Sequence, residues 1–490
     1  MVDYSIYEGY IRNNNIGEAI HYLRELLKEN PTGKTAGEIY EKLGYCGYLT
    51  CNMRLAADCY VKAAQNDEIL KNQVEHFSSF LFCLQYIDGI SPADLTKNIA
   101  YYDRFFQEQQ LYKHCPDKNI TRKLRIGYLS ADWREHAMAD FLSPFVSNFD
   151  EDKFEVFAYV LNEADNYTYR FKELGQKAIW RDLNNISPLE GAETIYQDHI
   201  DILVDLGGHS HGGVGLLIMA NKPAPLQMSG LGWINTTGLS TVDYFLTDRV
   251  CCKLAEDEDL FCEKPLVLEG PQLCYAPLER DKFCFVTKPL GRYKRQGTET
   301  VYGVFSNYNK ITDEMLRVWD TILSQVPDSL LVLKDTTGEL ARQEALRARM
   351  GKLGLKNVNQ IIVEQGSRDY LDCYRDIDIV LDTYPYTGGA TVCEALYMGR
   401  PVLALRGDNH GRRFSSSILE NAGLRDFITS DKEEYVKKAA AMGKDKEHLH
   451  QLQQEISDKF MHSSVMDSQA YMRELEGKYQ EIWENFVLRT

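Results

Sequence analysis

The chain has 490 residues, of which 44% are hydrophobic and 26% charged; this is the composition of an ordinary globular protein of about three domains and excludes a disordered or collagen-like chain. Its 55 basic and 72 acidic residues give a net charge of −17, which disfavours broad nucleic-acid binding. No apolar run is long enough to span a membrane, no signal-peptide pattern opens the chain, and the twelve cysteines contain no C-x-x-C pair, so we expect a cytoplasmic protein with reduced thiols.

The first part of the chain, residues 1–118, is predicted to be helical. Two sets of residues share helical spacing and lie 37 positions apart: Ala19, Leu23 and Leu26, then Ala56, Tyr60 and Ala63. Small residues at such positions let the two helices of a hairpin pack closely, and the pattern resembles a tetratricopeptide repeat. A plain helical bundle is the alternative. Two such units cannot bury a core alone, so we expect them to stack on the part of the chain that follows.

The composition then changes to strands and helices in alternation. Continuous apolar strands are predicted at 125–130, 154–160 and 201–206, with helical stretches such as 169–177 between them. After a polar segment at 291–298 the alternation resumes, with strands at 301–305, 330–333, 360–363, 379–381 and 401–405, and the chain closes on a helical pattern at 468–485. This alternation predicts two α/β domains with parallel sheets, over residues 119–295 and 296–490, the closing helix included in the second.

The segment 381–399 is the most informative candidate site. A strand ends at Asp382, a turn contains Pro385 and Gly388-Gly389, and a helix is predicted to start near Ala390 or Thr391. Glycines let a ligand approach the backbone, and the N–H groups of a first helical turn attract anions such as a diphosphate. We expect Glu394 in the first turn, where its carboxylate could bind a ribose. A tight turn followed by a helix with a glutamate near its positive end is the alternative.

Other candidates follow strands of the two predicted sheets. Lys310 follows the strand at 301–305, where α/β proteins bind ligands. His136 follows the strand at 125–130 and could act as a general base or orient a substrate, although a structural histidine is the alternative. The glycine-rich loop 207–213 does not have the dinucleotide-binding spacing. Its His209 and His211 suggest a metal, but no nearby carboxylate or cysteine completes a ligand set.

Several enzyme classes have no support, because the chain contains no G-x-S-x-G, Walker lysine or H-E-x-x-H motif. The remaining interpretation is a pair of doubly wound domains expected to face one crevice, with anion-binding loops on both. That architecture favours a nucleotide-sugar enzyme in which the second domain holds the nucleotide and the first shapes the acceptor side.

Taken together, the segments named below resemble the O-linked N-acetylglucosamine transferase family. The resemblance covers about residues 120–485 and rests on segments that occur in the family's order: 123–132, 201–209, 221–227, 232–248, 263–266, 305–312 and 381–399. It implies a GT-B fold of two Rossmann-like domains and a metal-independent, inverting glycosyltransferase that transfers N-acetylglucosamine from UDP-N-acetylglucosamine to serine or threonine of a protein. No cofactor other than this donor is implied.

The resemblance also implies roles for individual residues. His136 matches the family's active-site histidine, and Lys310 matches the lysine that stabilises the departing diphosphate. The donor-binding positions are His209, Asn307, Arg368, Gly388, Gly389, Ala390, Thr391 and Glu394. Within this set the N–H groups of 389–391 would hold the pyrophosphate, Glu394 the ribose, and Arg368 would lie near the uridine.

Four positions depart from the animal members of the family. Gly389 and Ala390 stand where those enzymes have histidine and threonine, so only backbone donors remain there, and Glu394 replaces an aspartate. His209 replaces a tyrosine and matches the glycine-histidine form of bacterial and Spindly-like members. Another donor (UDP-glucose or GDP-fucose), an asparagine acceptor, an epimerase or hydrolase of the same fold, or a non-catalytic protein-binding subunit are the alternatives. The acceptor protein and the oligomeric state are not encoded in any recognisable motif.

Overall fold

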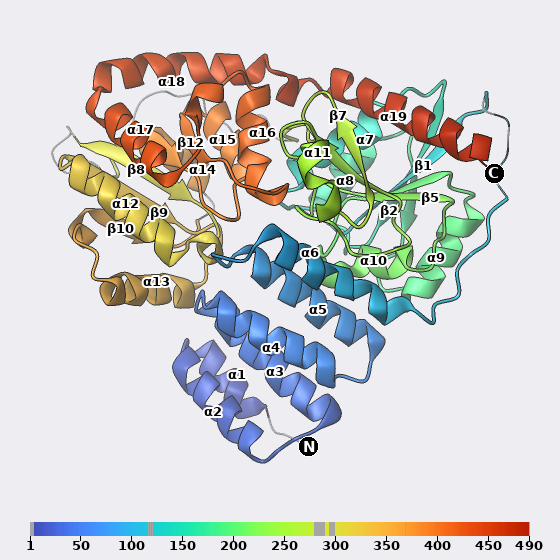
Figure 1. Cartoon of the computed structure of the whole chain (residues 1–490), viewed down its shortest axis with the longest axis horizontal. Coiled ribbons are helices and arrows are strands. Elements are labelled where there is room, and N and C mark those ends of the chain that lie inside the picture. The colour runs from blue at the N-terminus through green and yellow to red at the C-terminus, as the bar shows by residue number, and fades with distance from the viewer. Residues whose placement is uncertain are drawn as a thin grey trace. The chain divides into compact units, whose positions relative to one another are not determined.

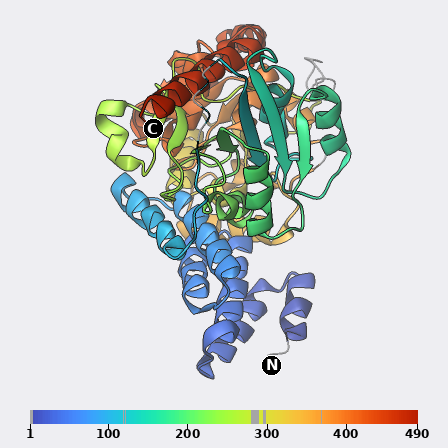
Figure 2. The same cartoon turned by 90° about the vertical axis from the view of Figure 1, so that its right-hand side faces the viewer.

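The computed structural model describes residues 4–115, 117, 119, 121–278, 290–293, 299–367 and 369–489. The chain forms two compact units, and each unit is built from two separate stretches of sequence (Figures 1 and 2). The first unit combines Met1–Ile90 with Asp281–Met461, and the second combines Ser91–Arg280 with His462–Thr490. No helix in the described part of the chain is both long and apolar enough to cross a bilayer.

The N-terminal region is helical, as predicted, and forms stacked antiparallel helices (Figures 1 and 2). Its helices are α1 (Ser5–Arg12), α2 (Ile16–Lys28), α3 (Gly33–Leu49), α4 (Met53–Asn66) and α5 (Leu70–Gln85). Helices α3 and α4 approach closely because glycines face the contact: a Cβ added to Gly47 would lie 2.7 Å from the backbone nitrogen of Ala56. The spacing residues Ala19, Leu23, Ala56 and Ala63 are completely buried.

These helices stack on the second α/β domain, with which they form one unit. Cys51 lies in a hydrophobic core with Trp319 and Leu316 of that domain, and Ala341 lies in the core of the helical arm. The helical region therefore ends earlier than the predicted boundary at 118, because α6 (Pro92–Ala100) and the 3₁₀ turn at Tyr101–Phe106 belong to the other unit. The Thr96 hydroxyl, for example, donates to the carbonyl of Leu260 there (3.0 Å).

The second unit contains a parallel sheet in the strand order β3-β2-β1-β4-β5-β6-β7. Its strands are β1 (Leu124–Ser130), β2 (Phe154–Val160), β3 (Ile179–Asp182), β4 (Ile202–Asp205), β5 (Leu226–Ser229), β6 (Tyr244–Asp248) and β7 (Lys264–Leu268). The connections between these strands contain the helices α7 (Ala139–Ser147), α8 (Asn166–Leu174), α9 (Pro188–Gln197), α10 (Val214–Met219) and α11 (Leu254–Asp257). The strand order reverses between β1 and β4, so the loops after these two strands leave the sheet at its switch point, where such folds bind ligands.

The first unit contains a second parallel sheet, in the order β10-β9-β8-β11-β12-β13. Its strands are β8 (Thr300–Phe305), β9 (Ser329–Lys334), β10 (Ile361–Glu364), β11 (Ile379–Leu381), β12 (Val402–Leu405) and β13 (Ile428–Thr429). The helices are α12 (Asp313–Gln325), α13 (Leu340–Leu353), α14 (Tyr370–Cys373), α15 (Ala390–Tyr397), α16 (Phe414–Asn421), α17 (Lys432–Lys444) and α18 (Lys446–Met461). Here the switch point lies between β8 and β11. Two Rossmann-like sheet domains preceded by helices are the GT-B organisation that the resemblance implies.

The strands at 154–160 and 379–381 have the predicted bounds, whereas β3, β5, β6, β7 and β13 were not predicted. The missed strands are short and contain polar residues or, in β7, a proline, so they lack the continuous apolar run on which the prediction relied. Tertiary pairing with a neighbouring strand, rather than local composition, stabilises them.

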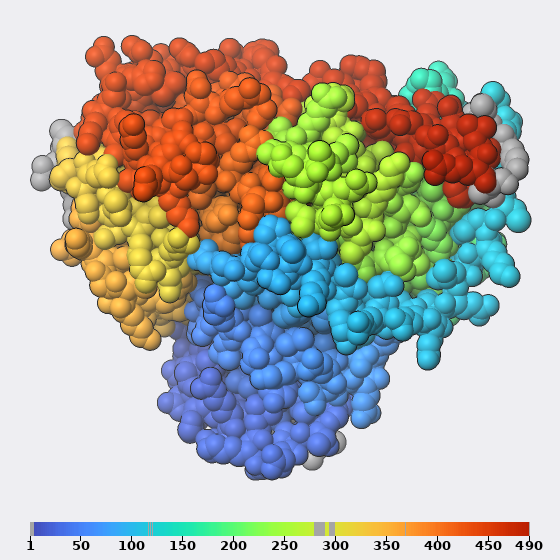
Figure 3. Space-filling model, in the orientation of Figure 1, coloured from blue at the N-terminus to red at the C-terminus, as the bar shows by residue number. Residues whose placement is uncertain are grey.

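The prediction assigned the closing helix to the second α/β domain. In the structure this helix, α19 (Ser468–Arg489), packs instead in the second unit, which contains the sheet of β1–β7. Its Tyr471, Leu475 and Trp483 are buried, and the Glu476 carboxylate accepts a hydrogen bond from the backbone N–H of Asp150 (2.8 Å). In Figure 3 this helix runs against the surface formed by the residues of β7 and its flanking loops. In the predicted linker, Leu290–Tyr293 is attached to the second sheet domain: the Gly291 N–H donates to Asp376 (2.8 Å). Residues 294–298 lie outside the described part.

Candidate functional site

The loop between β11 and α15 is organised by a buried carboxylate. Asp382 follows the strand directly, is 6% exposed, and accepts a hydrogen bond from the Gly388 N–H (2.9 Å). Burial raises the pKa of Asp382 to about 6. Helix α15 begins at Ala390, as predicted, with Gly389 at its N-cap and no side chain capping it. The first N–H groups of a helix have no partner within the helix, so this loop offers backbone donors to an anion.

Glu394 lies just beyond the first turn, in which it was predicted. Because α15 begins at Ala390, Glu394 is its fifth residue, and the first turn contains no acidic side chain. The error arose because the prediction placed the helix start only approximately. Glu394 is 6% exposed and its Oε1 accepts a hydrogen bond from the Tyr370 hydroxyl. A ribose at this carboxylate would share it with Tyr370, a neighbour that local sequence did not indicate.

Lys310 stands at the end of a stack of aromatic rings. Its ammonium lies 4.2 Å from the centroid of the Tyr386 ring, and Tyr386 stacks on Tyr86, just after α5, with centroids 5.0 Å apart. Burial lowers the pKa of Lys310 to about 8, and the negative charge of Asp382 opposes part of this shift. The lysine is therefore held near the β11–α15 loop as a cation with few solvating partners. The N-terminal helices thus contribute to the candidate site of this unit, which sequence reasoning missed.

Asn307 links the loop after β8 to the same arm. Its side-chain Oδ1 accepts from the backbone N–H of Asn309 (3.0 Å), which shapes the turn leading to Lys310. The Arg342 guanidinium also donates to that oxygen (3.4 Å) and lies over the ring of Tyr48 from α3 (4.6 Å). In the structure Asn307 therefore acts as a scaffold of the loop. A direct contact with a donor molecule stays a prediction.

The predicted residues of the first unit thus meet at the carboxyl ends of the adjacent strands β8 and β11: Asn307, Lys310, Gly388, Gly389, Ala390, Thr391 and Glu394. Arg368 lies outside the described residues. The two other predicted residues, His136 and His209, belong to the second unit and follow β1 and β4 at its own switch point.

His136 shares a buried carboxylate with a second histidine. Asp132, just after β1, is 1% exposed; its Oδ1 lies 3.1 Å from His136 Nδ1 and 2.7 Å from His211 Nε2. His136 Nδ1 also accepts a hydrogen bond from the backbone N–H of Met138 (3.3 Å). Burial lowers the pKa of His136, whereas the charge of Asp132 raises it in part. The two contacts of Nδ1 belong to different tautomers of the neutral ring, because Nδ1 accepts from Met138 only without a proton and donates to Asp132 only with one. In the tautomer whose Nδ1–H donates to Asp132, Nε2 is left to accept a proton from a substrate.

His209 differs from the predicted binding residue, because its ring is inside the domain. It is 1% exposed, packs edge-on against Tyr102 and Trp233, and its Nε2 lies 2.8 Å from the carbonyl of Thr237. Burial lowers its pKa to about 4. The preceding Gly208 has φ +56° and a Cβ there would lie 2.2 Å from Trp233. The arrangement favours a role for His209 in holding the loop, and contact with a donor stays a prediction.

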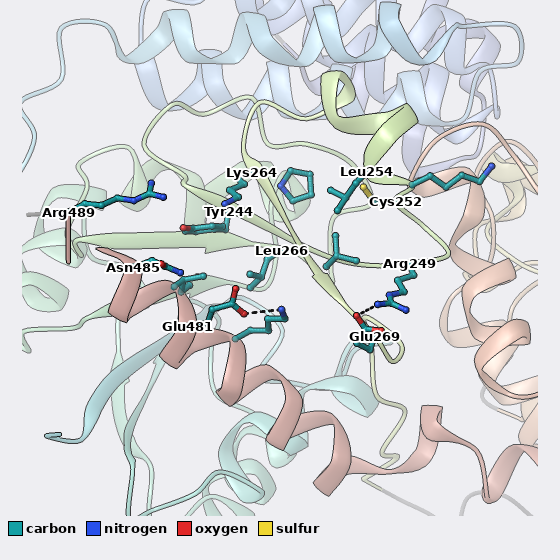
Figure 4. A pocket seen from close by; sticks show the side chains of 15 residues that line it. Tyr244, Arg249, Cys252, Leu254, Lys264, Leu266, Glu269, Glu481, Asn485 and Arg489 are labelled. Carbon is teal, nitrogen blue, oxygen red and sulfur yellow. Dashed lines mark hydrogen bonds and ion pairs between the residues drawn. The ribbon is translucent and has the colours of Figure 1, made fainter. Parts of the chain in front are cut away.

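A separate surface pocket of about 490 Å³ lies between the edge strand β7 and α19 (Figure 4). Four of its charged side chains form two ion pairs: Arg249 pairs with Glu269, and Lys478 lies 3.0 Å from Glu481. The lining also contains the basic side chains of Lys253, Lys264 and Arg489. None of the predicted site residues lines it. Because it lies away from the loops that follow the central strands of the sheet, we assign this pocket no part in the site.

Comparison with known proteins agrees with this architecture. The model of "Glycosyl transferase family 41" matches residues 77–269 and 281–475. The probable UDP-N-acetylglucosamine–peptide N-acetylglucosaminyltransferase SPINDLY of Oryza sativa subsp. japonica is 32% identical over 440 residues, which are 87% of this chain and 46% of that protein. The protein of the same name from Arabidopsis thaliana is 34% identical over 75% of this chain and 40% of its own length. The chain therefore spans less than half the length of these relatives.

A solved structure matches nearly the whole chain. A mutant of the Thermobaculum terrenum O-GlcNAc transferase superposes with a TM-score of 0.82 at 27% sequence identity, over 98% of this chain and 89% of that one. The match includes both sheet domains and the helical region. The fold predicted from the sequence is therefore confirmed.

Proposed function

The chain belongs to glycosyl transferase family 41, and from this premise we propose that it is an inverting protein O-glycosyltransferase. The proposed donor is UDP-N-acetylglucosamine and the proposed acceptor is a serine or threonine hydroxyl of a protein. The names of the SPINDLY relatives and of the superposed O-GlcNAc transferase support this choice of donor and acceptor.

The observation that carries the proposal is that Lys310 and the start of α15 both lie at the carboxyl ends of the neighbouring strands β8 and β11. As the acceptor oxygen attacks the anomeric carbon, the bond to the diphosphate breaks and negative charge grows on the β-phosphate. The Lys310 ammonium and the first N–H groups of α15 can stabilise that charge where little water screens it. The acceptor hydroxyl must lose its proton, and His136 Nε2 is the proposed base or positioning group in the other unit.

The proposed reaction needs no metal or other cofactor, because a lysine and backbone donors supply the positive charge that a metal ion provides in other transferases. EDTA should therefore leave turnover unchanged. We also propose that the protein acts in the cytoplasm. The described cysteines are free thiols, most of them buried, which suits a reducing compartment.

The activity is tested by incubating the full chain with radiolabelled UDP-N-acetylglucosamine, UDP-glucose or GDP-fucose and a cell lysate. Label from UDP-N-acetylglucosamine on protein, released by β-elimination from serine or threonine, supports the proposal. Label from another donor, label on asparagine, or release of free sugar alone would replace it with the corresponding alternative. Protein binding with no turnover of any donor would indicate a non-catalytic subunit.

Replacing Gly388 should weaken nucleotide binding. A Cβ at this position would lie 2.7 Å from Val392 Cγ2 and 2.9 Å from Asp382 Oδ1, so Gly388→Ala must shift the loop away from α15. We expect the Kd for UDP, measured by calorimetry, to rise at least about 10-fold, or about 1.4 kcal/mol. Gly351→Ala is the matched control, since a Cβ there meets nothing within 4 Å. An unchanged Kd for the Gly388 variant would contradict the assignment of this loop.

The pH dependence of turnover should report the ionisation of Lys310. Because burial lowers its pKa to about 8, the ammonium is lost as the pH rises through that value, and the stabilisation of the diphosphate is lost with it. We expect kcat/KM to fall above about pH 8, and kcat to fall only at higher pH because the bound donor is anionic. In Lys310→Arg the guanidinium stays charged, so the alkaline limb should disappear from whatever activity remains. A wild-type profile flat to pH 9.5 would contradict the prediction.

A further inference from the structure

Three potential metal ligands meet beside the switch point of the first sheet. One oxygen of Asp132 and one nitrogen each of His136 and His211 lie within 4.8 Å of one another. Asp132 and His136 follow β1, whereas His211 follows β4, 79 positions after Asp132. The carboxylate that the sequence around His209 and His211 lacked is therefore supplied by another strand.

The spacing of these atoms is close to that of a metal coordination sphere. In a tetrahedral zinc site with bonds of 2.0–2.1 Å, neighbouring ligand atoms lie about 3.3 Å apart. Asp132 Oδ1 lies 3.1 Å from His136 Nδ1 and 2.7 Å from His211 Nε2. The two rings are tilted by 62° to each other, with centroids 5.6 Å apart, so they approach the oxygen from different sides. To reach the zinc spacing, the contact between Asp132 and His211 would open by about 0.6 Å, and the two histidine nitrogens already lie within 4.8 Å of each other.

The ligands are also accessible and differ in burial. Asp132 is 1% exposed and fixed at the end of β1, where its own N–H donates to the Ser130 hydroxyl (3.0 Å). The side chains of His136 and His211 are 36% and 30% exposed, so an ion can enter from solvent. His211 has a positive φ of +48°, and so do the two glycines that follow it, Gly212 and Gly213.

We propose that Asp132, His136 and His211 form a binding site for a divalent transition-metal ion of the Zn²⁺ class, and that the bound ion inhibits the enzyme. Two imidazoles and one carboxylate suit Zn²⁺ and its neighbours, whereas Mg²⁺ and Ca²⁺ prefer oxygen ligands. Each neutral imidazole would bind through the named nitrogen and carry its proton on the other. The ion would replace the contacts of Asp132 with the two histidines and the 3.3 Å hydrogen bond from the Met138 N–H. Water molecules would complete the coordination sphere of the metal.

The binding step stands on these three residues alone, whereas inhibition rests on the proposed function. With His136 and Asp132 bound to an ion, the histidine would be fixed in one tautomer and its carboxylate partner withdrawn. His136 could then no longer act on the acceptor hydroxyl. Lys310 and the β11–α15 loop, which belong to the other unit, would still bind UDP.

Metal binding is tested on the full chain, free of any polyhistidine tag and treated with EDTA. Equilibrium dialysis against ZnCl₂ should give one ion per chain with a low-micromolar or lower Kd, and CoCl₂ should give the visible absorption of four- or five-coordinate Co²⁺. His211→Asn should weaken binding at least about 10-fold and abolish that absorption. Asparagine tolerates the positive φ at this position but is too short to reach the ion.

His21→Gln is the matched control, because His21 is exposed on α2 away from the cluster. It should bind Zn²⁺ as the wild type does. Circular dichroism and melting temperature establish that each variant is folded, and His211→Asn carries the test if Asp132→Asn fails to fold. Equal Zn²⁺ affinity in the wild type and His211→Asn, or adventitious binding only, would overturn the site.

Inhibition is measured separately from binding. In an active enzyme, the Zn²⁺ concentration that halves turnover should agree with the dialysis Kd, and EDTA should restore the rate. If Zn²⁺ occupies the site and turnover is unaffected, the inhibitory part of the proposal is wrong. A chain that binds Zn²⁺ at this site but transfers no sugar would refute the proposed function and leave the metal site established.

Discussion

Lys310→Ala should reduce kcat by about 10²–10³-fold, which corresponds to about 2.7–4 kcal/mol of lost transition-state stabilisation. The ammonium lies over Tyr386 beside the β11–α15 loop, and its charge matters most when the diphosphate departs. The ground-state complex also keeps the backbone donors at the start of α15. We therefore expect the Kd for UDP to change by less than about 10-fold, so that the loss falls mainly on kcat.

The same variant should not lose stability. Burial holds the pKa of Lys310 at about 8, below its ordinary value, so at pH 7 the folded state holds a cation that would be better solvated in the unfolded chain. Removing the charge should leave the melting temperature unchanged or raise it. Lys352→Ala, at an exposed position of α13, is the control for turnover and stability. Wild-type turnover of Lys310→Ala would refute its assignment to the leaving group.

His136→Ala should lower turnover by about 10²-fold or more, within the range that a general acid or base contributes. When Nδ1 carries the proton and donates it to Asp132, the ring is oriented so that Nε2 can accept the proton of the acceptor hydroxyl. If His136 is the base, kcat falls while the KM for the acceptor changes little. If it positions the acceptor, kcat is retained and KM rises.

Steady-state kinetics with a purified acceptor peptide distinguish these roles, and His21→Ala serves as the control histidine. Asp132→Asn separates orientation from proton transfer: an asparagine can still accept a hydrogen bond from a ring N–H but carries no charge to support an imidazolium. We expect it to retain more activity than His136→Ala. A His136→Ala enzyme with unchanged kcat and unchanged KM would remove this histidine from the reaction.

Part of the candidate site could be predicted because its information is local. The strand at 379–381, the glycines after it and the helix from Ala390 are consecutive, and short-range sterics and hydrogen bonding specify strand, turn and helix start. The same holds for Lys310 and His136, because each follows the carboxyl end of a central strand. Glu394 falls just outside the predicted first turn because the prediction left the helix start open between Ala390 and Thr391, and helix boundaries are uncertain by a residue or two.

Other parts of the site depend on residues that are far apart in the chain. The stack of Tyr86, Tyr386 and Lys310 joins the helical arm to the second sheet, and Asp132 reaches His211 across 79 positions. Likewise, helix α19 packs in the unit that contains β1–β7, although in the sequence it follows the strands of the other sheet. No periodicity or spacing distinguishes these partners from the many other aromatic, acidic or helical segments of the chain.

The sequence by itself therefore determined the alternation of strands and helices, the two α/β domains and the loops that follow their central strands. Only the tertiary structure decided which carboxylate orients His136, which rings support Lys310 and to which unit the terminal helices belong. The physical reason is that backbone propensity and hydrophobic period act within a few residues. The choice of a distant partner depends instead on how whole surfaces pack, and that choice is made by the folded chain as a whole.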